Sequence, residues 1–142
     1  MDYFVGQKAE ISKTITETDV YNFAGICGDF NPVHVNVSEA EKSIFKNRVA
    51  HGALVSSFIS TVLGMYLPGP GTIYLSQKCD FLKPVYFNDT ITAKVEICSI
   101  DIRGKARLCT QVYNQREEMV IDGEAIVKLP KKPNKIITKE TE

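Results

Sequence analysis

Residues 51–66 read HGALVSSFISTVLGMY and form the middle of a run without charged side chains, residues 49–77. That run is long enough to span a bilayer. However, it is interrupted by several serines and threonines and then by the segment PGPG at residues 68–71. A helix with so little charge is expected when protein surrounds it on nearly all sides. The run therefore predicts one buried helix over residues 51–66 and no membrane span.

The second half of the chain is predicted to be β structure. Four segments are long, alternating and rich in β-branched residues: 72–82, 90–102, 105–114 and 119–129. In the second of them Ile91, Ala93 and Val95 point to one side, while Thr92 and Lys94 point to the other. Residues 8–15 alternate more weakly and could add a strand. The expected fold class is α+β, with an antiparallel sheet wrapped around the buried helix.

Two shorter helices are predicted before the buried one. The first begins at Thr16, a plausible N-cap with Asp19 three residues later, and ends near Gly28. The second is expected over residues 38–45, with Ser38 and Glu41 as a capping box. Apolar residues at helical spacing should face the core: Val20, Phe23, Ala24 and Cys27 in the first helix, and Ala40 and Ile44 in the second.

Composition indicates one domain whose charges produce no strong electrostatic field around it. The chain has 142 residues, 44% of them hydrophobic, and its 17 basic and 17 acidic residues give a net charge of zero. We expect a single domain over residues 1–130, followed by a flexible lysine-rich tail at 131–142. The balanced charge argues against nucleic acid or an anionic membrane as a partner.

Neither targeting nor metal binding is indicated. The first seven residues, MDYFVGQ, lack a basic head followed by an apolar run, so we expect a cytoplasmic location. The four cysteines, Cys27, Cys79, Cys98 and Cys109, lie far apart, without the spacing of a metal site. We interpret them as reduced core residues, and we expect neither a metal nor a cofactor.

The loop after the first helix concentrates the polar chemistry. Residues 28–34 read GDFNPVH, which places a carboxylate, an amide and an imidazole within seven residues. Pro32 lacks an N–H and keeps Asn31 out of the helical region, so we expect a bent, extended loop. Such a loop can direct Asp29 and His34 toward one point, which a continuous helix could not do for residues five apart.

These residues resemble the hydratase 2 motif of the MaoC-like, (R)-specific enoyl-CoA hydratases. The matching positions are Gly28, Asp29, Asn31, Pro32, His34 and Ala40, followed by HGAL at residues 51–54. Segments 68–75, 81–85 and 123–130 resemble later parts of the family in order and spacing, so the resemblance covers nearly the whole chain.

The resemblance implies a hotdog fold, in which a sheet wraps a central helix, and a homodimer or higher homo-oligomer with active sites near the interface. It also implies an activity. Water adds reversibly and syn to a trans-2-enoyl-CoA, and the product is the (R)-3-hydroxyacyl-CoA. No cofactor is needed for this reaction.

Site residues follow from the same resemblance. Asp29 is expected to polarise the attacking water and His34 to donate a proton at C2, although a single water bridging both would leave the two roles open. Ser60 corresponds to a serine that supports the catalytic aspartate, but a serine bonded back to the preceding helical turn is an equal alternative. Asn31 is expected to brace the loop or the bound water.

The start of the buried helix supplies a candidate donor for the thioester oxygen. The backbone N–H of Gly52 lies where helical N–H groups are unpaired and the helix dipole is positive. His51 is interpreted as a helix-start residue rather than a proton carrier.

Two other functions remain open from the sequence. A hotdog thioesterase would direct a carboxylate-activated water at the thioester carbonyl, but it would not need Asp29 and His34 at this spacing. A non-catalytic acyl-CoA-binding module would be expected to lack one of the two groups.

Overall fold

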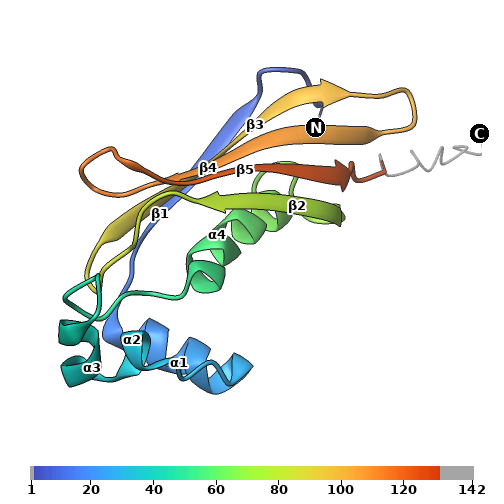
Figure 1. Cartoon of the computed structure of the whole chain (residues 1–142). Coiled ribbons are helices and arrows are strands. Elements are labelled where there is room, and N and C mark those ends of the chain that lie inside the picture. Colours follow the sequence, from blue (N-terminus) through green and yellow to red (C-terminus); the bar gives the residue numbers. More distant parts are fainter. Residues whose placement is uncertain (1, 132–142) are drawn as a thin grey trace, which may run out of the picture.

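The structure is a computed structural model that describes residues 2–131, so the predicted tail lies outside the described residues except for Lys131. In chain order the elements are β1 (Lys8–Thr14), α1 (Glu17–Cys27), α2 (Pro32–Val35), α3 (Val37–Lys42), α4 (Gly52–Met65), β2 (Ile73–Phe81), β3 (Thr90–Ile100), β4 (Lys105–Tyr113) and β5 (Met119–Lys128). Figure 1 shows α4 against the sheet, with α1, α2 and α3 gathered at one end of the molecule.

All five strands join one antiparallel sheet in the order β1-β3-β4-β5-β2. The four strands predicted in the second half are confirmed, each within two residues of its expected ends, and the weaker first segment is a strand as well. Because β3, β4 and β5 occupy the centre, β1 and β2 are the two edges.

Helix α4 packs on the sheet through contacts with β1, β3 and β4. Its inward side is formed by Leu54, Val55, Ile59, Val62 and Leu63, all buried. The inward side chains of β3 are also buried, as the alternation predicted. The predicted α+β arrangement around a buried helix is thus confirmed. Within residues 2–131, no helix has the length and apolar character needed to cross a membrane.

Helix α1 has the predicted ends. Thr16 and Asp19 form a full capping box, and Gly28 ends the helix in the left-handed region at φ 79°. Its buried side is narrower than expected, since Val20 and Ala24 are buried but Phe23 is only partly so. Cys27, expected on the buried side, is exposed.

The next segment differs from the expectation in two ways. The loop expected to be extended contains the one-turn helix α2, because Asn31 accepts the Val33 N–H and Pro32 fits the first helical position. Helix α3 begins after Asn36, not at Ser38, since the Asn36 side chain accepts the backbone N–H of Glu39.

Helix α3 also ends earlier than predicted, at Lys42. Ile44 is therefore outside the helix and 88% exposed, so its predicted inward position is wrong. Ala40 is buried, as expected. The prediction that all four cysteines belong to the core is wrong too, because Cys27 is exposed and the other three are half-buried.

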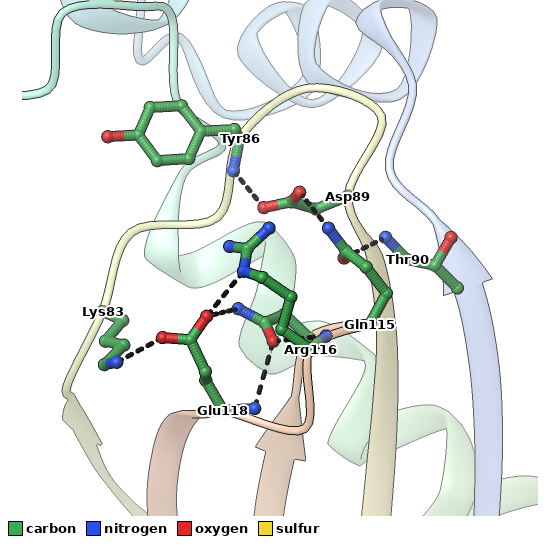
Figure 2. A network of polar contacts seen from close by, with 8 residues as sticks. Lys83, Tyr86, Asp89, Thr90, Gln115, Arg116 and Glu118 are labelled. Atoms are coloured by element: carbon green, nitrogen blue, oxygen red, sulfur yellow. Dashed lines mark hydrogen bonds and ion pairs between the residues drawn. The ribbon is translucent and has the colours of Figure 1, made fainter.

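A polar network joins the connection between β2 and β3 to the turn between β4 and β5 (Figure 2). Glu118 pairs with Lys83 and accepts a 2.7 Å bond from Arg116 Nε. Asp89 accepts a 2.8 Å bond from the amide of Gln115. The network fixes the segment that carries Lys83 into the cleft described next.

Candidate active site

A cleft of about 690 Å³ lies between the α2 segment, the start of α4 and the end of β2. Most of its lining is apolar, including Phe45, Phe81 and Ile121, and its polar lining includes Asn31 and His34. A cleft of this size and character is suited to a ligand with an apolar chain and a polar reacting group.

Asp29 is presented by the turn that follows α1. The positive φ of Gly28 reverses the chain direction there, as a glycine at a helix end allows. The Asp29 carboxylate accepts the backbone N–H of Asn31 at 3.1 Å, and the side chain of Asn31 in turn accepts the N–H of Val33 at 3.3 Å. Asn31 therefore braces the loop, and the Asp29 carboxylate remains exposed to solvent.

His34 is held in one orientation by the backbone. Its Nδ1 lies 2.6 Å from the carbonyl oxygen of Val49, and because a carbonyl only accepts, the Nδ1–H is the donor. The position of the Val49 carbonyl is fixed in turn, because the Val49 N–H donates to the carbonyl of Val33 and Val49 forms a β-bridge with Tyr86. In the neutral ring, the remaining nitrogen, Nε2, is then an acceptor.

His51 joins the two residues predicted to be catalytic. Its Nε2–H donates to the backbone carbonyl of Asp29 at 2.9 Å, and its ring stacks on His34 with 3.8 Å between centroids. The side chain is only 2% exposed, and Phe23 packs on it at 5.0 Å. His51 is the N-cap of α4, as the sequence indicated, but it makes no side-chain cap bond. Its second role, bracing the site, was missed.

One group of side-chain atoms could bind a metal or transfer a proton. The ligand atoms of Asp29, His34 and His51 lie within 4.8 Å of one another. However, the Nε2 of His51 is bonded to a carbonyl, and its Nδ1 is buried without a partner among the described residues. Asp29 and His34 are therefore the two accessible groups, fewer than the three protein ligands of a typical catalytic zinc site.

Gly52 brings a backbone donor to this cleft. It is the first residue of α4, and since His51 makes no cap bond, the first-turn N–H groups are not used by that side chain. A Cβ at this position would come within 2.7 Å of the Phe81 ring. Any larger residue here would therefore force the exposed Phe81 ring to shift, and Phe81 is a lining residue that the sequence alone did not identify.

Ser60 is not brought to the same place within one chain. It lies on the exposed side of α4, in a separate groove with Tyr74 and Leu75 of β2. Ser56 and Ser57 bond back to the carbonyls of the preceding turn, but the Ser60 hydroxyl makes no such bond in the part of the chain that is described. The structure therefore joins Asp29, Asn31, His34 and Gly52 and leaves Ser60 apart.

Comparison with known proteins gives a consistent result. A family model described as MaoC like domain matches residues 5–119. An (R)-specific enoyl-CoA hydratase from Rhodospirillum rubrum is 45% identical over 125 residues, which cover 88% of this chain and 87% of the relative. A 3-hydroxybutyryl-CoA dehydratase from Methylorubrum extorquens is 44% identical over 92% of this chain and 83% of its own length.

A solved structure supports the fold. The unliganded R-hydratase PhaJ1 from Pseudomonas aeruginosa superposes with a TM-score of 0.88 at 41% identity, covering 92% of this chain and 84% of that one. The hotdog fold expected from the sequence is thereby confirmed. With the family model matching most of the described residues, this chain belongs to the family of proteins with a MaoC-like domain.

Proposed function

We propose that this protein is an (R)-specific enoyl-CoA hydratase, which adds water reversibly to trans-2-enoyl-CoA and forms (R)-3-hydroxyacyl-CoA. The observation that carries the proposal is the meeting of Asp29 and His34 beside an apolar cleft that also contains Gly52. Relatives named for hydration and for the reverse dehydration match this chain over more than four fifths of their length.

The two side chains suit the chemistry of hydration. Water is a weak nucleophile, so a base must take one proton while the oxygen attacks C3, and an acid must deliver a proton to C2. We propose that the water is held between the Asp29 carboxylate and the Nε2 of His34. Addition from one face of the double bond then requires both groups on the same side, which their proximity allows.

Gly52 is proposed to stabilise the charge that develops during the attack. Electrons move from the double bond onto the thioester oxygen, which then needs a donor already in place. The Gly52 N–H, at the positive end of α4, is our candidate, and loss of such a donor typically costs about 3 to 4 kcal/mol of transition-state stabilisation.

We further propose that the working form is a homodimer that pairs through β2. The first part of this edge strand exposes Ile73, Tyr74 and Leu75, and its charged residues, Lys78 and Asp80, follow further along. The opposite edge, β1, carries exposed charged residues from its start, Lys8 and Glu10. An apolar, uncovered edge strand is a surface on which another chain pairs, while a charged edge resists it.

The dimer proposal also gives Ser60 a place. Its groove on α4 is bordered by Tyr74 and Leu75, so the same surface would be covered by the second subunit. In that arrangement Ser60 would support the active site of the second subunit, and not Asp29 of its own chain.

The test is the loss of enoyl-thioester absorbance with crotonyl-CoA and with a longer trans-2-enoyl-CoA. We expect the wild type to hydrate at least one of these substrates to the (R) product, identified with a stereospecific dehydrogenase. Asp29→Asn and His34→Gln should each lower kcat by roughly a hundredfold or more, because each removes one proton-transfer group.

Asp122→Asn is the matched control, since Asp122 is an exposed residue of β5 whose carboxylate, among residues 2–131, bonds only to Gln111. It should keep wild-type activity. Release of free CoA with the double bond intact would instead indicate a thioesterase, and ligand binding without either reaction would indicate a binding module. Full activity in the Asp29 and His34 variants would contradict the roles given to these residues.

A further inference from the structure

Two cysteines on neighbouring strands are in direct contact. The Sγ atoms of Cys98 on β3 and Cys109 on β4 lie 2.7 Å apart. No other pair of the four cysteines, all of which lie within residues 2–131, shows a sulfur–sulfur contact. The sequence offered no sign of this pair, because the two residues are eleven positions apart and form no recognised motif.

The contact lies at an irregularity in strand pairing. Cys109 lies opposite Glu96, and the register shifts between Ile97 and Ser99, which leaves Cys98 as the extra residue of a bulge. In a regular ladder Cys98 would have a partner of its own. In the structure Cys98 has no partner in the ladder, and its Sγ contacts that of Cys109.

Both thiols face away from the helix. Their neighbours Ile97 and Leu108 are fully buried toward α4, whereas Cys98 and Cys109 alternate with them and are half-buried on the other side of the sheet. Neither cysteine lines the cleft that contains His34. The proposed hydration therefore has no use for this pair.

Cys109 is a neutral thiol at rest. The hydrogen bond with Cys98, aided by burial, raises the pKa of Cys109 to about 11, so this thiol stays protonated near neutral pH. A protonated sulfur can contact its neighbour without charge repulsion.

We propose that Cys98 and Cys109 form a dithiol modification site that small-molecule disulfides, such as oxidised glutathione, close into an intramolecular disulfide. Because Cys109 stays protonated, Cys98 is the residue that attacks the reagent as a thiolate, which releases one reduced thiol and leaves a mixed disulfide on Cys98. The second protein thiol displaces the other half of the reagent, so two electrons pass to the reagent and two reduced thiols are released. The final sulfur–sulfur bond requires only a small approach from the observed contact.

The experiment uses the full chain with the other cysteines removed, Cys27→Ser/Cys79→Ala, so that only the dithiol can react. After incubation with oxidised glutathione, the protein is unfolded, alkylated and weighed by mass spectrometry. We expect both thiols to become unavailable with a loss of two hydrogen atoms and no bound glutathione.

Digestion of the wild type locates the bond. Trypsin cleaves after Arg103, Lys105 and Arg107, so the proposed disulfide would join peptide 95–103 to peptide 108–116. Reduction should separate the two peptides. Closing the loop should also raise Tm by about 5 to 10 °C, since the cross-link restricts the unfolded chain.

Single variants in the same background supply the controls. Cys98→Ser and Cys109→Ser each leave one thiol, which should either stay free or retain a bound glutathione, without the increase in Tm. Retention of two free thiols by the dithiol protein would overturn the proposal. So would a stable mixed disulfide or a bond between two chains.

Discussion

At the residue scale, position 52 shows how packing limits the choice of side chain in the cleft. The Phe81 ring would lie 2.7 Å from a Cβ at this position, closer than real contacts allow. We predict that Gly52→Ala lowers kcat/KM by roughly a hundredfold, because the added methyl group prevents the close approach of the thioester to the backbone N–H.

A second substitution separates this effect from a simple clash. In Gly52→Ala/Phe81→Ala the ring is absent, so any strain caused by Phe81 is relieved, while the methyl group beside the N–H remains. In steady-state hydration kinetics, the kcat/KM of the double variant should stay about as far below that of Phe81→Ala as Gly52→Ala lies below the wild type. Recovery to the level of Phe81→Ala would mean that Gly52 serves packing and not catalysis.

At the scale of single elements, the turn between β4 and β5 depends on a carboxylate. Lys83, Arg116 and Asn114 donate to Glu118 and lower the pKa of this residue to about 2. Because the folded-state pKa lies below the ordinary value of 4.5, the stabilisation is present above pH 4.5 and is lost as the pH falls toward 2.

We therefore predict that Glu118→Gln destabilises the protein above pH 4.5 and that its difference from the wild type shrinks toward pH 2. Urea unfolding at several pH values measures this difference directly. Glu117→Gln is the matched control, since Glu117 makes no ion pair within the described residues. A wild-type advantage that stays constant over the whole pH range would contradict the prediction.

At the scale of the whole molecule, the two edges of the sheet differ in a way that predicts assembly. Leu75 on β2 is an exposed apolar residue at the proposed interface. We predict that Leu75→Glu yields monomers in sedimentation or light scattering, since an unpaired charge buried in the interface weakens association by about 3 to 5 kcal/mol, roughly a hundredfold or more in Kd.

Ile102→Glu is the control for this experiment. Ile102 is fully exposed in the turn between β3 and β4, so the same substitution there adds a charge without touching β2. It should leave the molecular mass unchanged. A wild type that is monomeric, or a Leu75→Glu variant that remains dimeric, would exclude pairing through this edge.

Local signals in the sequence determined most of the elements and part of the site. Alternation located the strands, the absence of charge located α4, and the capping box at Thr16 located the start of α1. Such signals depend on residues a few positions apart, so they can be read without the fold. At the start of α3 the sequence predicted Ser38 as the cap, and this was wrong because the Asn36 side chain caps the helix two residues earlier.

Contacts between distant parts of the chain were decided only by the tertiary structure. The bond from His51 to the Asp29 carbonyl, the contact of Cys98 with Cys109 and the separation of Ser60 from the cleft each depend on packing or strand register. Each of these distances joins residues far apart in the sequence or on different strands, so no short stretch of sequence predicts it. The sequence thus determined which groups are available for chemistry, and the fold determined which of them meet, because sheet register and helix packing set the positions of residues far apart in the chain.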